Sequence, residues 1–161
     1  MFLIQSIYIA PLVAIYVLTC LVAKLYCVAC SGESKWYIWV PFGVREVAVC
    51  EASENMHPIG LRSMYLWIIC AVQWVCFVIG ICMDISLPYS YNTIAQCFLF
   101  VSALGYIALY VFTCVYIYYV ASDVSKHAMV WVVLHTLLGF LVDPIISVSY
   151  THLRAHETRH D

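Results

Sequence analysis

Four long apolar segments dominate the pattern of hydrophobic and polar positions along the chain. They cover residues 2–30, 64–83, 93–121 and 128–148, and the first contains a single charged residue, Lys24. A lipid hydrocarbon core of about 30 Å needs about 20 helical residues, so each segment is long enough to cross it. None of them shows the short alternating units of a membrane β-barrel. The pattern predicts an all-α fold, an integral membrane bundle of four transmembrane helices.

The connection between the first two segments is unusually apolar. Residues 35–54 read KWYIWVPFGVREVAVCEASE, which is too short and too charged to cross a membrane. Pro41 can begin a helix at its first turn, after which Val44, Val47 and Ala48 fall on one face. We therefore expect a short interfacial or re-entrant helix between helices one and two.

Two roles are open for this segment. In the first, it is a structural plug that closes the inner end of the bundle. In the second, it contacts a lipid headgroup or a substrate, with Arg45 available to anionic groups. In both cases Arg45, Glu46 and Glu54 are expected to stay in contact with water. The candidate residues of this loop are Trp36, Trp39, Pro41, Arg45 and Glu46.

Basic residues set the expected orientation. Before the last thirteen residues, four of the five basic side chains lie in or beside the loop 31–63, and the fifth is Lys126 in the loop 122–127. The loop 84–92 has none. Because Lys and Arg mark the cytoplasmic side, we expect both basic loops in the cytoplasm and both termini outside, in a multi-pass protein of the cell membrane.

Composition supports lipid as the solvent of this chain. The 161 residues are 65% hydrophobic and 10% charged, against about 25% charged in soluble domains. A formal charge of −2 argues against nucleic acid as a partner. The expected partner is the lipid bilayer, with other membrane proteins or a second copy of the chain as further candidates. No nucleotide-binding motif is present, and no cofactor is expected.

Polar side chains inside the predicted spans are the main site candidates, because each is costly to place in lipid. They are His135 and Asp143 in the fourth segment, Gln73 in the second and Gln96 in the third. One interpretation is structural, with interhelical hydrogen bonds worth about 0.6 kcal/mol each. The other is a path for protons or a solute through His135 and Asp143.

Eight of the nine cysteines lie within the predicted spans, and the ninth is Cys50 in the loop 31–63. Cysteine packs between helices as a small apolar residue, and this is the role we expect. Cys27 and Cys30 are the one pair with the C-x-x-C spacing that is typical of redox and metal sites. They would lie at the cytoplasmic interface, where thiols stay reduced.

The tail contains a literal H-E-x-x-H motif. On a helix His156 and His160 would share a face suited to zinc, with Glu157 as general base and His152 one turn earlier. The motif ends one residue before the last, which leaves no downstream ligand. The string SYTHLRAHETRHD also resembles a translated sequencing adapter. We therefore interpret 1–148 as one transmembrane domain and 149–161 as a non-native tail, and expect no metal site.

The order of local motifs carries a family resemblance. Ala23-Lys24-x-Tyr26 is followed by Gly32-Glu33, by a Lys-Trp-x-x-Trp-x-Pro box at 35–41, and by a Gly-x-x-x-x-Pro stretch at 139–144. Over most of residues 10–147 the chain resembles small multi-helix inner-membrane proteins of gut Firmicutes, whose box is a tryptophan followed by Ile-Pro. The resemblance implies a bacterial inner membrane and transfers no activity, because those proteins are of uncharacterised function.

Three functional classes follow. The first is a non-enzymatic scaffold or accessory subunit of a membrane complex, supported by the small residues Ser102, Gly105 and Ala108, which suit a helix–helix face. The second is a small-solute or ion transporter, or a channel protomer, acting as an oligomer. The third is a membrane enzyme, including a zinc metallopeptidase if HETRH is genuine.

Each alternative class makes its own structural demand. A transporter requires His135, Asp143 or Gln96 to line one shared cavity. An enzyme requires either the tail motif or the acidic side chains of the first loop, which are Glu46, Glu51 and Glu54.

Overall fold

The computed structural model describes residues 2–41, 43–55, 63–86 and 92–157, and every regular element within these ranges is helical. The α-helices are α1 (Phe2–Ser31), α2 (Val44–Glu54), α3 (Ser63–Ser86), α4 (Asn92–Val124) and α5 (Ala128–Glu157), and a 3₁₀-helix, η1 (Trp36–Trp39), precedes α2. The predicted all-α class is confirmed.

Three of these helices are long and apolar enough to cross a membrane. The candidate spans are Val13–Ser31 in α1, Ser63–Ile85 in α3 and Thr93–Val124 in α4. Large apolar side chains cover their outer faces, and Leu25, Phe100 and Ile107 are each more than half exposed. Apolar surface on this scale marks contact with lipid or with other proteins, so the chain is of the membrane type.

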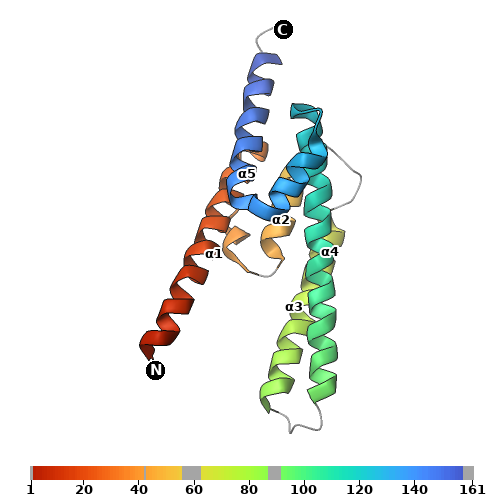
Figure 1. The fold of residues 1–161 in the computed structure, drawn as a ribbon. Coiled ribbons are helices and arrows are strands. Elements are labelled where there is room, and N and C mark those ends of the chain that lie inside the picture. Colours follow the sequence, from red (N-terminus) through yellow and green to blue (C-terminus); the bar gives the residue numbers. More distant parts are fainter. Residues whose placement is uncertain (1, 42, 56–62, 87–91, 158–161) are drawn as a thin grey trace.

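The described residues give three candidate spans and not the four that were expected. α5 contains a non-helical residue, Leu138, with φ −140° and ψ 36°. The apolar run before this break, Ala128–Leu138, rises about 16 Å at 1.5 Å per residue, which is half of a hydrocarbon core. Figure 1 shows that α5 runs from the end of α4 toward the middle of the molecule and then turns back. Hydrophobicity alone predicts the apolar length of 128–148 but not the reversal within it.

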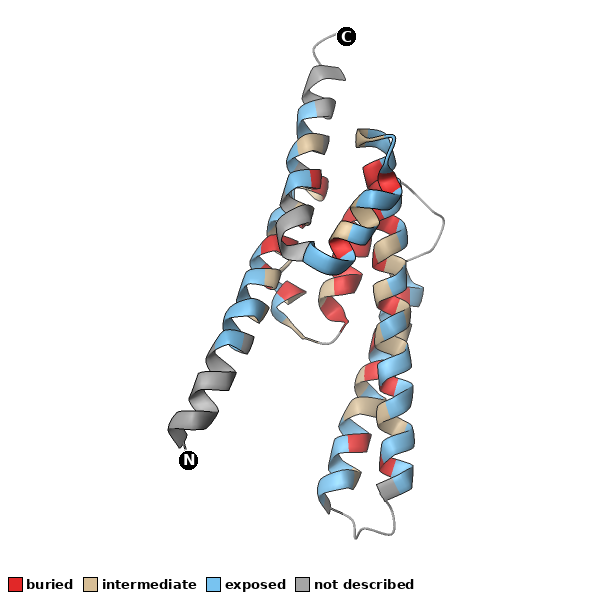
Figure 2. Ribbon diagram, in the orientation of Figure 1, coloured by how far each residue is buried: buried red, intermediate tan, exposed pale blue. Residues whose placement is uncertain are grey.

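The short helix expected between the first two segments is present and lies deep in the structure. α2 contacts α1, α3 and α4 and is placed between α1 and the antiparallel pair α3–α4 (Figure 1). Its predicted inner face is confirmed, since Val44, Val47 and Ala48 are all buried. Figure 2 shows that buried residues gather around α2 and thin out along the far half of α3–α4.

The expected role of Pro41 is wrong, because α2 begins only at Val44. Its N-cap, Gly43, has φ +92°, a left-handed conformation that glycine adopts without the cost of a Cβ atom. A Cβ at this position would also lie 2.5 Å from Gln73 Oε1 and 2.6 Å from Leu109 Cδ1. Gly43 therefore lets the chain turn sharply into α2 while touching α3 and α4.

The two ends of the described chain lie far apart. The start of α1 and the end of α5 lie at opposite ends of the molecule, and α1 and α4 end toward the same end of it (Figure 1). The sides of the membrane on which the termini and the two basic loops lie stay predictions.

Candidate functional site

An ion pair between adjacent residues lies in the first turn of α2. Arg45 donates to Glu46 Oε1 from Nη2 at 2.5 Å and from Nε at 3.1 Å, and the Tyr106 hydroxyl of α4 lies 3.5 Å from the same oxygen. The Glu46 side chain is only 3% exposed, against 26% for Arg45. The expectation that Glu46 stays in water is wrong, because α2 is inserted between the long helices rather than lying on their ends.

Half of the Glu46 carboxylate is unused. Its second oxygen, Oε2, is buried and has no hydrogen-bond partner among the described residues. A buried acceptor in this state loses its hydration without compensation. Unpaired buried groups in native structures call for an explanation, such as a ligand or a water that occupies the adjoining space.

A second polar pair bridges the break in α5. His135 Nδ1 lies 2.6 Å from Asp143 Oδ1, and the imidazole stacks on the Tyr110 ring at 6.0 Å with an interplanar angle of 21°. In a straight helix residues eight apart are separated by about 12 Å. The reversal at Leu138 therefore creates this contact. His135 Nε2 is buried and has no partner among the residues the structure describes.

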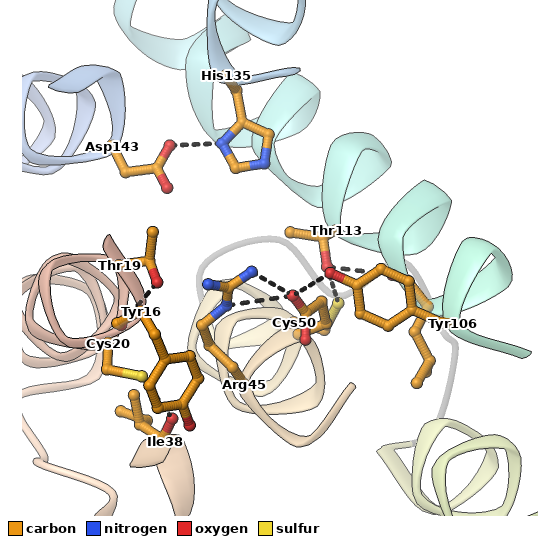
Figure 3. Close-up of polar contacts among 12 residues, drawn as sticks. Tyr16, Thr19, Cys20, Ile38, Arg45, Cys50, Tyr106, Thr113, His135 and Asp143 are labelled. Carbon is orange, nitrogen blue, oxygen red and sulfur yellow. Dashed lines mark hydrogen bonds and ion pairs between the residues drawn. The ribbon is translucent and has the colours of Figure 1, made fainter. Parts of the chain in front are cut away.

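Two cavities meet at Arg45 and Glu46. The larger, of about 630 Å³, is lined by Tyr16, Pro41, Arg45, Glu46, Gln73, Phe77, Leu99, Ser102, Ala103 and Tyr106. The smaller, of about 180 Å³, is lined by Thr19, Val22, Ala23, Arg45, Glu46, Val49, Tyr110, Thr113, His135 and Asp143. Figure 3 shows His135 and Asp143 facing each other, with Arg45 across from them on α2. The ion pair of α2 thus borders both spaces.

The four intramembrane candidates divide between these cavities and the outside. His135 and Asp143 line the smaller cavity, and Gln73 lines the larger one. The buried Gln73 Oε1 has no hydrogen-bond partner within the described ranges. Gln96 is exposed on α4 and is not among the residues that line either cavity. Three of the four residues predicted from the sequence therefore line a cavity, and Gln96 does not.

The loop candidates before α2 have separate surroundings. Trp36 is 78% exposed. The main-chain carbonyl of Trp39 accepts a hydrogen bond from the Tyr16 hydroxyl at 2.5 Å, which ties η1 to α1. Pro41 lines the larger cavity. Of these three, Pro41 alone borders the site.

A polar cluster that the sequence analysis missed holds η1 against α2 and α3. Lys35 Nζ and the Tyr37 hydroxyl each donate to Glu51 Oε2 at 2.5 Å, and Trp67 Nε1 donates to Oε1 at 2.7 Å. Burial alone raises the pKa of Glu51, but these three donors outweigh it and lower that pKa below its usual value. Burial and Glu51 raise the pKa of Tyr37 to about 12. The spacing of 35, 37, 51 and 67 gives no periodic signal that could have revealed the cluster.

The acidic residues considered for an enzyme serve different contacts. Glu46 pairs with Arg45 and Glu51 with Lys35. Burial, followed by the nearby charge of Glu51, raises the pKa of Glu54. In the described part of the chain no hydrogen bond joins any two of these three carboxylates, so they do not form a shared pair there.

The metal and redox candidates do not form a cluster within the residues described. Cys27 and Cys30 are buried on α1, and Cys27 Sγ lies 3.5 Å from the Ala48 carbonyl of α2. Among described residues, no group of three or more His, Cys, Asp or Glu could hold a metal ion. His152 is exposed, whereas the His156 side chain and His160 lie outside the described part, so the tail motif stays a prediction.

The small residues expected to form a partner-binding face are used within the chain. A Cβ on Gly105 would lie 3.1 Å from the Gln73 Cβ atom, which shows that α4 approaches α3 closely here. Ser102 is buried and lines the larger cavity. At Gly105 this face of α4 is therefore occupied by α3.

Comparison with known proteins adds no relative, since no protein-family model, curated protein or solved structure matches the chain. What the protein does is therefore inferred from the two cavities and from the charged pair between them.

Proposed function

We propose that the chain is a small-solute or ion transporter, or a channel protomer, of a bacterial cytoplasmic membrane. The observation that carries this proposal is the Arg45–Glu46 pair, which lines both the 630 Å³ and the 180 Å³ cavity. Ionisable residues within membrane helices mark substrate paths and proton relays. His135 and Asp143 extend the polar lining on the side of the smaller cavity.

The backbone supports the same proposal. Non-helical backbone at membrane depth is tolerated where it is buried in protein or lines a cavity. The described residues include two such interruptions, at Gly43 before α2 and at Leu138 within α5. Broken helices that meet near a binding site are a general feature of secondary transporters.

The orientation belongs to the proposal as well. The loops 31–63 and 122–127 carry the basic residues, so we place them in the cytoplasm. α2 and the first part of α5 then enter the membrane from the cytoplasmic side, and the N-terminal end of α1 lies outside. In this arrangement α2 has the role of a substrate-contacting element rather than a plug.

A transport role is favoured over a scaffold by a specific contact. Gly105, which belongs to the small-residue face of α4 that supported a scaffold, packs against Gln73 of α3. The buried pair of charges is expensive to keep in an apolar bundle, which favours a role that uses these charges.

Reconstitution tests the proposal. Purified protein in liposomes is assayed by stopped-flow light scattering against a panel of small neutral, zwitterionic and ionic solutes, and with an internal pH dye for protons. We expect protein-dependent flux of at least one species, lost in Glu46→Gln. Gln96→Leu, a glutamine replacement outside both cavities, is the matched control and keeps the flux. A folded wild-type protein that conducts none of the panel contradicts a transport role.

A further inference from the structure

We propose that the larger cavity binds an amphiphile with a net-neutral, zwitterionic head, in which a primary ammonium group donates to Glu46 Oε2 and an anionic group faces Arg45. This assignment rests on the proposed transport function and names its substrate class. Two sources share this chemistry, a free apolar amino acid and the phosphoethanolamine head of a lipid.

The polar end of the cavity demands hydrogen-bond donors. Glu46 and Gln73 are each 2% exposed, and Glu46 Oε2 and Gln73 Oε1 both lack a partner among described residues. Both residues line the larger cavity. An ammonium group with three N–H donors matches this pattern, and a charge-assisted hydrogen bond to a carboxylate is stronger than a neutral one.

The same end also attracts an anionic group. Arg45 uses Nε and Nη2 on Glu46, and its guanidinium has five donors in all. The N-terminal end of α2, where Gly43 is the N-cap, adds the partial positive charge of a helix N-terminus. Carboxylate and phosphate groups are the anions that arginine binds best.

Charge balance selects a neutral ligand. Arg45 and Glu46 together carry no net charge, and burial of a net charge in a low-dielectric bundle costs several kcal/mol. A ligand that brings only an ammonium or only a carboxylate leaves one charge uncompensated. A zwitterion brings one partner for each side chain and keeps the site neutral.

The other end of the cavity is apolar. Its lining along α4 changes from Tyr106 through Ser102 and Ala103 to Leu99, and Phe77 of α3 adds a further apolar side chain. Seven residues of α4 separate Leu99 from Tyr106, a distance of about 10 Å along the helix. A ligand that spans the cavity therefore needs an apolar body behind its polar head. A volume of about 630 Å³ lies within the range of about 300–1,000 Å³ of small-molecule sites.

Three ligands with the same aromatic body test the head group. L-Phenylalanine carries both charges, 2-phenylethylamine only the ammonium, and 3-phenylpropionate only the carboxylate. Each competes with radiolabelled phenylalanine for detergent-purified wild-type protein. We expect the zwitterion to bind at least about tenfold more tightly than either single-charge analogue, the factor expected for one charge-assisted hydrogen bond.

A lipid arm tests the second source. The protein is reconstituted in equal amounts of phosphatidylethanolamine and phosphatidylcholine, and the co-purified lipid is measured by native mass spectrometry. Both lipids carry a phosphate, but the quaternary head of phosphatidylcholine has no N–H donor. If the ligand is a lipid, we expect retention of phosphatidylethanolamine over phosphatidylcholine by about tenfold.

Variants locate the binding. Glu46→Gln is expected to abolish the preference for the ammonium in whichever arm shows it, and Gln73→Leu to reduce affinity, while Gln96→Leu binds like the wild type. If Glu46→Gln fails to fold, the ligand series on wild-type protein and Gln73→Leu still decide. Preference in either arm supports the assignment and identifies the source. No preference in both arms overturns it.

The two proposals fail in different ways. A zwitterion that binds selectively but does not cross the liposome membrane refutes transport and leaves the site assignment intact. Flux of a different solute, with no zwitterion preference in either arm, refutes the assignment and leaves transport intact.

Discussion

Removal of one partner of the Arg45–Glu46 pair has an asymmetric cost that can be worked out from the structure. In the intact pair the Glu46 side chain is 3% exposed and the Arg45 side chain 26%, so Arg45→Leu leaves the more deeply buried of the two charged side chains unpaired. Breaking a buried pair by deleting one partner costs about 3–5 kcal/mol, because the remaining charge stays buried and unpaired. We expect this range for Arg45→Leu and a smaller loss for Glu46→Leu, because the long Arg45 side chain can move its charge toward water.

The free energy of unfolding lost in Arg45→Leu should therefore be about 3–5 kcal/mol. The double variant Arg45→Leu/Glu46→Leu leaves no buried charge and is expected near wild type.

Unfolding in mixed micelles, followed by far-ultraviolet circular dichroism during titration with dodecyl sulfate, measures these differences. Lys126→Leu, a charge removal at an exposed loop position, is the matched control and should change the free energy of unfolding by less than about 0.5 kcal/mol. Equal losses in both single variants, or a double variant as unstable as the sum of the two, would refute the reasoning from burial.

Three further predictions concern the region around α2. Gly43→Ala should destabilise the fold by more than Gly32→Ala, since both glycines have positive φ but a Cβ at Gly32 meets nothing within 4 Å. The left-handed conformation costs about 1–2 kcal/mol at either position, and overpacking adds about 1–3 kcal/mol at Gly43. Equal unfolding midpoints for the two variants would contradict the packing at this turn. Because the pKa of Glu51 is lowered in the fold, its ionised form stabilises the fold at pH values above the ordinary glutamate pKa of about 4.3, and this contribution is lost as pH falls through the lowered pKa. Melting temperatures measured from pH 6 to pH 3 should show the loss in wild type and not in Glu51→Gln. Parallel curves of melting temperature against pH for the two proteins would count against the cluster. Burial raises the pKa of Cys50 to about 12, so maleimide at pH 7.5 should modify this thiol only after unfolding. Peptide mass spectrometry locates the label, and rapid labelling of Cys50 in the folded protein would show that α2 is not buried.

Helix content and membrane type could be predicted from the sequence because both depend on local composition. The apolar runs that became α1, α3 and α4 exceed the length of a hydrocarbon core, and the inner face of α2 follows from the spacing of Val44, Val47 and Ala48. These properties need no knowledge of tertiary contacts. These three spans and the buried face of α2 could therefore be predicted from the sequence.

The break at Leu138 could not be predicted in the same way. Its neighbours are apolar, so hydropathy continues across it, and a non-helical φ and ψ at Leu138 is a tertiary feature. The contact between His135 and Asp143 depends on this reversal. The sequence analysis considered both residues for one proton or solute path, but it could not predict that they lie within hydrogen-bond distance.

The environment predicted for Glu46 was wrong for a related reason. A charged residue in a loop with tryptophan and tyrosine is typical of a membrane interface, and nothing local distinguishes that position from insertion between α1 and α4. Insertion is what places the Arg45–Glu46 pair beside two cavities. The candidate site thus depends on where one short helix lies. That position could not be predicted from the eleven residues of α2.

Solute flux through the folded double variant Arg45→Leu/Glu46→Leu tests the central claim most directly. This variant keeps the pair's volume apolar and should retain the wild-type fold, so loss of activity cannot be blamed on unfolding. With the solute that the wild-type protein carries best, we predict flux at the level of protein-free liposomes, with circular dichroism and gel filtration unchanged. Wild-type flux through the folded double variant would show that the charged pair between the cavities is not part of the transport path.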